Sequence, residues 1–420
     1  MVEKFLAGSA ALFGDPITIA IFVFGVIGGM LFGAIPGVSM LTLAAILLPF
    51  TADLDPAQGV MLFAVIYCTG TYGGAITAIL FNIPGAPENA PTAFDGYPMT
   101  RQGKSGKAVG AAVLCSAIGG VASALVMMAA TEPLANWAIR NIGPPEIFAL
   151  VFFGLAVASS VGGRTIWKGW MSVLLGLLIA TIGQDPVGGI NRYNFGFTDL
   201  AAGIAFVPAI LGFFAVSEIF VQAEKKATGQ YDAPKVGMSF PSVLELWAHK
   251  FAVVRSILVG FFCGILPGIG ATLAAFMGYG EAVRWSKNKE EFGKGKLEGV
   301  ISSETANNAA TGAAMIPLLA LGLPGGALTA MMVAVFQMHD LEPGPLVFYN
   351  SPELIWIVFA AMFYANLSIL FIGLIETKTI LYLLKIPFQF LAPLILLLAT
   401  IGAYISRGLV LDVMVMFGAG

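Results

Sequence analysis

Four proline-glycine pairs inside apolar stretches are the residues of this sequence best suited to binding a ligand. Pro36-Gly37 and Pro84-Gly85 lie in the first half of the chain, and Pro267-Gly268 and Pro324-Gly325 repeat the order in the second. Proline removes a backbone donor and breaks a regular helix, and glycine permits backbone angles closed to other residues. One such pair could be only a kink or a packing contact, whereas four in matched positions indicate a site.

Interrupted helices at these pairs would expose helix ends to a ligand. A helix N-terminus offers N–H groups and a partial positive charge that suit a carboxylate, and unwound carbonyls suit a cation. Because no lysine or arginine lies beside the pairs, an anionic substrate would be held by backbone N–H groups, hydroxyls and amides. The predicted substrate-binding residues are Pro36, Gly37, Ser39, Asn82, Pro84, Gly85, Pro267, Gly268, Thr272, Pro324 and Gly325.

A polar cluster, Glu304–Asn308, precedes the fourth pair within an apolar stretch. An ionisable group at membrane depth is a candidate functional residue, and on a helix Glu304 and Asn308 would share a face. The alternative is that Glu304 is a solvated acid in a first helical turn. We predict that Asn307, Asn308 and Gly322 bind a coupling cation, Na⁺ or a proton, and that no other cofactor or metal is needed. Asp95–Pro98 is typical of a turn by composition.

The composition predicts an all-α polytopic membrane protein. Of the 420 residues, 58% are hydrophobic and only 11% are charged, whereas soluble domains carry roughly 25% charge. Apolar stretches long enough to span a bilayer recur along the chain. The three cysteines lie in apolar stretches without metal-ligand spacing, and His249 and His339 stand apart, so neither type predicts a metal or catalytic site. No basic stripe suggests nucleic acid, and we expect no cleaved signal peptide.

Loop charge predicts that the two halves are inverted-topology repeats. Between the two pairs of each half, the loop is acidic at 51–58 but basic at 284–296. After the second pair it is basic at 101–107 but acidic at 340–353. Because lysine and arginine are enriched in cytoplasmic loops, corresponding loops should lie on opposite sides of the membrane.

Each repeat is predicted to hold a re-entrant hairpin, a discontinuous helix broken at a proline-glycine pair, and scaffold helices. The hairpins are expected at 17–50 and 251–280, and the discontinuous helices at 59–100 and 299–339. Transporters of this plan bind substrate and ions near the bilayer midplane. The scaffold spans are expected near 108–130, 147–162, 166–184, 200–221, 354–375 and 387–405.

The corresponding domain division has three parts. Residues 1–221 form the first inverted repeat, 222–250 a cytoplasmic connector, and 251–420 the second repeat. Residues 387–420 resemble 147–180 in apolar pattern, and the first half then adds a further span. The second repeat is therefore expected to be incomplete at its C-terminus.

Over essentially its whole length the chain resembles the large membrane subunit of the tripartite tricarboxylate transporters. The stretches that carry the resemblance are Gly33–Gly37, Leu47–Thr51, Tyr72–Gly74, Asn82–Pro87, Asp95–Pro98, Gly264–Gly270, Glu304–Ala309, Gly322–Gly325 and Pro343–Pro345. The family often has a small residue or serine where this chain has Glu88 and Asn89, so its substrate could differ.

The resemblance implies a multi-pass protein of the bacterial inner membrane that imports a tricarboxylate, dicarboxylate or related organic anion, driven by a cation. It further implies a small membrane subunit and a periplasmic substrate-binding protein as partners, and it allows a homodimer of the large subunit. Two other classes stay open: an anion channel, and an intramembrane enzyme. Enzyme motifs such as a phosphate-binding Walker loop or a zinc-protease helix are absent from the sequence, so we expect no enzyme.

Overall fold

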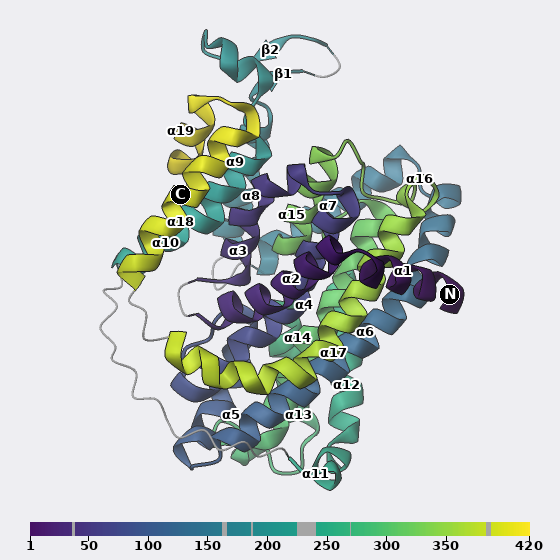
Figure 1. The fold of residues 1–420 in the computed structure, drawn as a ribbon, viewed down its shortest axis with the longest axis vertical. Coiled ribbons are helices and arrows are strands. Elements are labelled where there is room, and N and C mark those ends of the chain that lie inside the picture. The colour runs from purple at the N-terminus through teal and green to yellow at the C-terminus, as the bar shows by residue number, and fades with distance from the viewer. Residues whose placement is uncertain (36–37, 162–165, 186–187, 225–240, 269, 384–387) are drawn as a thin grey trace.

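A computed structural model describes residues 1–35, 38–161, 166–185, 188–224, 241–268, 270–383 and 388–420, and it is almost entirely helical in this part (Figure 1). The α-helices are α1 (Val2–Gly14), α2 (Pro16–Ala34), α3 (Met40–Leu47), α4 (Pro56–Phe81), α5 (Ala90–Arg101), α6 (Ser105–Asn141), α7 (Pro144–Val161), α8 (Ile166–Ala180), α9 (Phe206–Ile210), α10 (Ser217–Glu224), α11 (Val243–Ala248), α12 (Lys250–Ile265), α13 (Gly270–Trp285), α14 (Leu297–Leu321), α15 (Ala327–Met338), α16 (Val347–Asn350), α17 (Pro352–Leu383), α18 (Phe388–Arg407) and α19 (Val410–Ala419). Short 3-10 helices are η1 (Leu48–Asp53), η2 (Pro87–Asn89), η3 (Thr198–Ala202) and η5 (Lys289–Glu291), and η4 (Leu211–Val216) is a π-helix.

A small β-hairpin is the exception to the predicted all-α fold. Strand β1 (Gly183–Gln184) pairs antiparallel with β2 (Asn191–Arg192) in the loop that follows α8. The predicted span 166–184 therefore ends earlier, at Ala180. An ion pair of 3.0 Å between Arg192 of β2 and Asp185, the residue after β1, links the two sides of this hairpin.

Two fully buried helices, α4 and α14, form the centre of the molecule. Every residue from Gly59 to Leu80 and from Glu298 to Ala320 is buried. Cys68 Sγ and Thr311 Oγ1 lie 3.9 Å apart where the two helices cross. The helix that follows α4, α5, lies against α14, and the helix that follows α14, α15, packs on α4. Since α5 reaches the start of α14 and Val335 of α15 reaches Gly59, α4 and α14 run in opposite directions.

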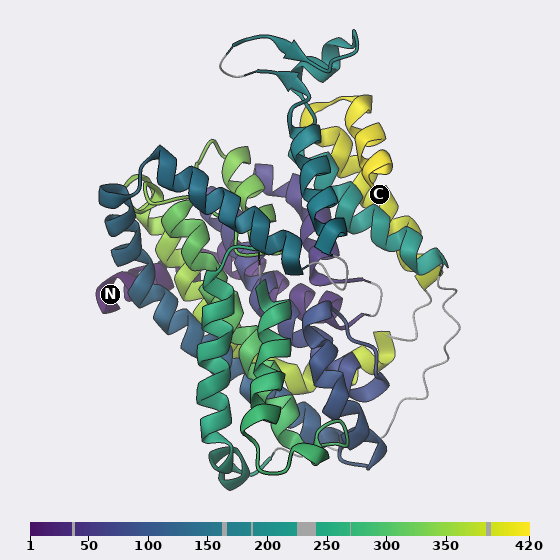
Figure 2. The ribbon, with the colours of Figure 1, turned by 180° about the vertical axis from the view of Figure 1, so that it is seen from behind.

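A long helix packs alongside each central helix through the same pattern of small residues. A Cβ added to Gly29 of α2 would collide with Thr69 Oγ1 and lie 3.0 Å from Ile66 Cα of α4, and one added to Gly33 would collide with Gly70 O. In the second half, the backbone of α14 at Ala306 and Ala310 lies against Gly260 and Gly264 of α12 in the same way. Glycines four residues apart let two helices approach to backbone contact, as in membrane helix pairs. The chain then reverses into α13, which packs on α12 (Figure 2). Helix α3 likewise packs back on α2.

The interruptions predicted at Pro84-Gly85 and Pro324-Gly325 are present and have one geometry. Helix α4 ends at Asn82, whose φ of 59° is left-handed, and α14 ends at Gly322 with a φ of 74°. In both, the next N–H donates to a carbonyl six residues back: Ile83 to Thr77 at 3.3 Å, and Leu323 to Pro317 at 3.1 Å. Each pattern is a helix ending through a left-handed residue, with hydrogen bonds one residue wider than in the Schellman motif. The left-handed residue is thus the one at the helix end, and not the glycine after the proline as we expected.

Six helices among the described residues are long and apolar enough to cross a membrane. They are Pro16–Ala34, Pro56–Phe81, Ser105–Asn141, Phe206–Glu224, Pro352–Gly373 and Phe390–Arg407. The described parts of α7 and α8, at the predicted spans 147–162 and 166–184, are apolar but shorter. Helix α14 falls outside the six although it has 25 residues, because its middle carries Glu304, Asn307 and Asn308. A long helix with polar side chains in its middle is therefore one of the two most deeply buried among the described residues.

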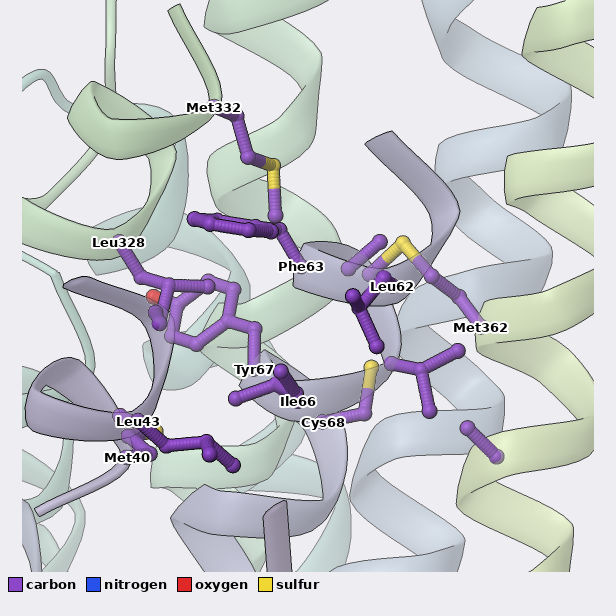
Figure 3. Close-up of a cluster of buried hydrophobic side chains, with 14 of the residues drawn as sticks. Met40, Leu43, Leu62, Phe63, Ile66, Tyr67, Cys68, Leu328, Met332 and Met362 are labelled. Atoms are coloured by element: carbon purple, nitrogen blue, oxygen red, sulfur yellow. The ribbon is translucent and has the colours of Figure 1, made fainter. Parts of the chain in front are cut away.

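The apolar core surrounds the N-terminal half of α4. Phe63 and Tyr67 face Leu328 and Met332 of α15, and Met362 of α17 lies on another side of the same helix (Figure 3). Burying an apolar side chain of this size contributes about 1.5–3 kcal/mol relative to exposure in water. Near the C-terminus, α19 packs on η4 and α9, and the buried carboxylate of Asp412 pairs with Arg407, which also donates to Gly203 O at 3.2 Å.

Asp95–Pro98, which we predicted to be a turn, lies inside α5 instead. The Asp95 carboxylate accepts hydrogen bonds from the N–H groups of Gly295 at 2.9 Å and Lys296 at 2.8 Å, and from the Tyr279 hydroxyl at 3.0 Å. These tertiary contacts, rather than local turn preference, decide the conformation. They bind α5 to the start of α14 and to α13.

Candidate functional site

Those predicted substrate-binding residues that the structure describes lie at the two interruptions, at the start of α3 and at the reversal between α12 and α13. Pro36 and Gly37 fall outside the described residues. Ser39 caps the start of α3: its Oγ accepts from Thr42 N–H, and Thr42 Oγ1 accepts from Ser39 N–H, each at 3.4 Å. Asn82 is exposed at the end of α4, whereas Gly325 is buried. The remainder are half-buried: Ser39, Pro84, Gly85, Pro267, Gly268, Thr272 and Pro324.

The first interruption folds back onto the helix that it ends. Gly85 N–H donates to Gly74 O at 3.3 Å, and a Cβ at position 85 would overlap Gly33 O of α2. Asn89 Nδ2 then donates to Thr71 O at 2.8 Å. The glycine is required here for close approach between backbones. The interruption is thereby fixed against both α4 and α2.

The second interruption is joined to the reversal between α12 and α13. Gly268 N–H donates to Gly325 O at 3.2 Å, and a Cβ on Gly325 would lie 2.8–3.0 Å from atoms of Ala314. Gly268 and Gly270 have φ of 81° and 62°, so this reversal uses the left-handed region twice. In this conformation the N–H groups of Gly85 and Gly268 both have protein acceptors.

Glu88 joins the two halves of the site. Thr272 Oγ1 of α13 donates to Glu88 Oε2 at 3.4 Å, and Asn307 Nδ2 of α14 donates to the backbone O of Glu88 at 3.4 Å. The Glu88 side chain is only 5% exposed, and its Oε1 has no hydrogen-bond partner. A buried carboxylate thus stands between the first interruption and the second reversal.

Glu304 of α14 lies next to this junction, and its side chain is completely buried. Its carboxylate accepts from Thr92 Oγ1 of α5 at 2.5 Å and from Ser116 Oγ of α6 at 2.9 Å. Asn307 Nδ2 also donates to it at 3.4 Å. The alternative interpretation of Glu304 as a solvated acid is therefore wrong. The same cluster places Thr92 and Ser116, which the sequence did not single out, around the carboxylate.

The three residues predicted to bind a cation do not form one site. Asn308 Nδ2 donates to Asn307 Oδ1 at 2.8 Å, and Asn308 Oδ1 is buried without a partner. Because a helix rises about 1.5 Å per residue, Gly322 lies roughly 20 Å from Asn308 along the axis of α14. Asn307 and Asn308 are therefore adjacent to each other and to Glu304, but Gly322 cannot share an ion with them.

Buried oxygens without hydrogen-bond partners occur on η2, α14 and α17. Glu88 Oε1, Asn89 Oδ1, Asn308 Oδ1 and Asn366 Oδ1 are buried and lack hydrogen-bond partners. All four are acceptors, and none of these residues is in an ion pair among the described part of the chain. Buried acceptors without donors are the groups that a bound cation or water would satisfy. A separate cavity of about 490 Å³ is lined by apolar residues such as Pro16, Phe24 and Leu62, away from these oxygens.

Comparison with known proteins identifies the class to which this arrangement belongs. The sequence model of the tripartite tricarboxylate transporter TctA family matches residues 19–420. The chain belongs to this family. The TctA family is a transporter family, so this protein is a subunit of a transporter and not an enzyme, and the resemblance inferred from the sequence is confirmed.

Two proteins of Agrobacterium vitis are similar to this TctA-family chain. One, described as an uncharacterized 52.8 kDa protein in the TAR-I ttuC' 3'region, is 36% identical over 412 residues, which cover 96% of this chain and 80% of the relative. The other, described as an uncharacterized protein in the TAR-II ttuC' 3'region, is 40% identical over 145 residues, 34% of this chain and 60% of the relative. No solved structure matches the chain.

Family membership and the six apolar helices together make this TctA-family chain a multi-pass membrane protein. A tripartite transporter contains further subunits, so the chain acts as part of an assembly.

Proposed function

We propose that this subunit carries an organic carboxylate across the bacterial inner membrane by cation-coupled alternating access. A periplasmic binding protein delivers the substrate, and a small membrane subunit completes the assembly. The substrate binds between the two interruptions and the two chain reversals, at the level where α4 and α14 cross. The following observations support this proposal.

Helix N-termini at the interruptions and reversals supply positive potential for an anion. Each proline-glycine pair is followed by the start of a helix: α3, α5, α13 and α15. The first-turn N–H groups of a helix have no acceptor within the helix and carry a partial positive charge. Because Gly85 and Gly268 N–H already have acceptors, we assign substrate recognition to the first turns of these helices, with the hydroxyl of Thr272 beside them.

The buried carboxylates of Glu88 and Glu304 are the main support for coupling to a cation. Both are buried, and among the described residues neither is paired with a lysine or arginine. An unpaired buried charge is costly, and an anionic substrate nearby would add repulsion. Cations on the unpartnered oxygens, including Asn308 Oδ1, would offset both effects, so substrate and cation bind together. We favour Na⁺ for these oxygens, with a proton as the alternative.

The corresponding helices of the two halves run in opposite directions, which supports inverted repeats. Helix α2 runs parallel to α4, since Gly29 and Gly33 contact successive turns of α4, and α12 runs parallel to α14 in the same manner. Because α4 and α14 are antiparallel, the two hairpins would enter the membrane from opposite sides. Such a pair of units permits a central site to open alternately to each side.

Transport by the reconstituted assembly tests the proposal. The three subunits are placed in proteoliposomes with radiolabelled citrate as the probe tricarboxylate, and with an inward Na⁺ gradient, an inward proton gradient, or neither. We expect saturable uptake that concentrates citrate only with a cation gradient and with binding protein present. Uptake that merely equilibrates citrate under every gradient would instead identify an anion channel.

A further inference from the structure

Tyr67 of α4 has a buried side chain whose hydroxyl has no hydrogen-bond partner among the described residues. The residue is only 4% exposed. Its ring lies among apolar side chains such as Met40 and Leu328, and it extends from α4 towards the first turn of α15 (Figure 3). A buried tyrosine hydroxyl usually has a hydrogen-bond partner, so this group is available to a ligand.

The hydroxyl lies at the N-terminus of α15, directly after the second interruption. A Cβ built on Gly326, the N-cap residue of this helix, would lie 3.9 Å from Tyr67 Oη. Gly326 N–H donates to Thr329 Oγ1 at 2.8 Å, whereas the N–H groups of residues 327–329 have no acceptor in the described part of the chain. Ala327 is exposed, so a ligand can reach this end of the helix.

The N-terminus of α13 lies against the same place. The Cβ position on Gly326 is 3.7 Å from the Cα of Gly270, which is the first residue of α13. Helices α13 and α15 have 16 and 12 residues, so each carries a partial positive charge at its N-terminus. Two helix N-termini and a tyrosine hydroxyl therefore lie together, and all of them favour an anion.

Glu88 is a charged side chain near these donors. It interacts electrostatically with Tyr67, and its Oε2 accepts from Thr272 Oγ1 of α13 at 3.4 Å. An anion beside Tyr67 is repelled by the Glu88 carboxylate. The Na⁺ of the proposed function, bound at oxygens that include Glu88 Oε1, offsets this repulsion. The anion and the cation are therefore neighbours.

We propose that Tyr67 and the first turn of α15 bind one carboxylate group of the substrate. The proposal rests on the proposed function and names the residues that recognise this group. Tyr67 Oη donates one hydrogen bond to the carboxylate, and the N–H groups of the first turn donate others. Because a phenol hydroxyl donates without adding a positive charge, binding of the carboxylate stays dependent on the cation.

Tyr67→Phe tests the inference, because it removes the hydroxyl and keeps the ring. The matched control is Tyr72→Phe on the same helix, where the hydroxyl donates to Gly373 O at 3.1 Å. The large and small membrane subunits are purified together in saturating Na⁺ and without the binding protein, whose own specificity then has no effect. Thermal unfolding is measured over a range of citrate concentrations, since a ligand that binds the folded state raises the melting temperature.

The two variants should behave in opposite ways. Tyr67→Phe should melt like the wild type without citrate. It should need at least about tenfold more citrate for the same rise in melting temperature, because a hydrogen bond to a charged group is lost. Tyr72→Phe should melt at a lower temperature without citrate, and it should respond to citrate at the same concentrations as the wild type.

Tyr67→Phe that responds to citrate like the wild type would overturn the inference, since the hydroxyl would then contact no substrate. The inference also fails if Tyr67→Phe melts at a lower temperature without citrate and responds to citrate like Tyr72→Phe, because the hydroxyl then has a structural role. A wild type that shows neither a citrate-dependent rise nor uptake by the complete assembly contradicts the proposed function itself, so the two failures are distinct.

Ala327→Asp gives an independent result if Tyr67→Phe does not insert. An acid in the first turn stabilises a helix, and Ala327 is exposed, so this variant should not melt below the wild type. Its charge repels the substrate carboxylate, so at least about tenfold more citrate should be needed for the same rise. The uncharged control, Ala327→Asn, should need less citrate than Ala327→Asp. Equal responses of Ala327→Asp and the wild type would show that the carboxylate binds elsewhere.

Discussion

Replacing Gly85 with alanine should open the first interruption. The added Cβ would overlap Gly33 O and lie 2.7 Å from Gly74 Cα, whereas ordinary contact begins at 3.4 Å. The neighbouring atoms belong to the backbones of α2 and α4, so no side chain can rotate away. Those helices must separate by at least 0.7 Å, and overpacking of this kind costs about 1–3 kcal/mol. Since the clash includes an overlap, we expect a loss of about 3 kcal/mol in the free energy of unfolding.

Thermal unfolding in detergent and citrate uptake in proteoliposomes measure this effect. The control is Gly280→Ala on α13, where an added Cβ meets no atom within 4 Å; alanine there should stabilise the helix by about 0.5–1 kcal/mol. Gly325→Ala should be intermediate, because its closest contacts are 2.8–3.0 Å. Gly85→Val and Gly325→Val should abolish uptake in protein that still inserts. If Gly85→Ala unfolds and transports like Gly280→Ala, the close approach described here is not a requirement of the fold or the site.

Further predictions concern the neighbouring helices and the membrane topology. Asp95→Asn should lower the free energy of unfolding by about 1.5–3 kcal/mol, which is the contribution of hydrogen bonds to a charged group. Denaturation measures this loss. A change below about 0.5 kcal/mol would mean that the contacts to Gly295 and Lys296 contribute little. Asn308→Ala should raise the Na⁺ concentration needed for half-maximal uptake more than it raises the KM for citrate, and equal changes would remove Asn308 from the cation site. Single cysteines at 101–107 and 284–296 should react with a membrane-impermeant reagent from the cytoplasmic side, and those at 51–58 and 340–353 from the periplasmic side. Labelling of 101–107 and 340–353 from one side would contradict the inverted repeats.

The sequence predicted the interruptions because proline and glycine act locally. Helices α4 and α14 end three residues before Pro84 and Pro324, each of which is followed by glycine. Other prolines, without a following glycine, lie inside helices: Pro98, Pro133, Pro317 and Pro393. The hairpins at 17–50 and 251–280 were predicted from the charge of the flanking loops, and they stay predictions. What the sequence could not assign was which residue would adopt the left-handed conformation, since Asn82 and Gly322 do so together with the hydrogen bonds that end α4 and α14.

The partners of Glu304 were beyond sequence reasoning for a different reason. Thr92 and Ser116 belong to α5 and α6, and their distance from Glu304 depends on how three helices are rotated about their axes. Apolar membrane helices give little periodic pattern from which to read that rotation. Glu88 was noticed only as a departure from the family, and its position directly after an interruption could have marked it as a site residue. Asp95 was misassigned because its hydrogen-bond donors lie 200 residues away.

The hydrogen bonds that the Asp95 carboxylate accepts also affect how the chain folds while it is being synthesised. Its acceptor oxygens and the N–H group of Lys296 are separated by 201 residues, and ribosomes add roughly 5–20 residues per second. The Asp95 carboxylate therefore exists for about 10–40 s before its partners have been synthesised. During that time α5 cannot reach its final position. The Asp95 carboxylate must then be hydrated at the aqueous interface or be held by the insertion machinery. The first half of this chain is thus completed only by the second, so folding during synthesis must wait for residues well past the midpoint of the chain.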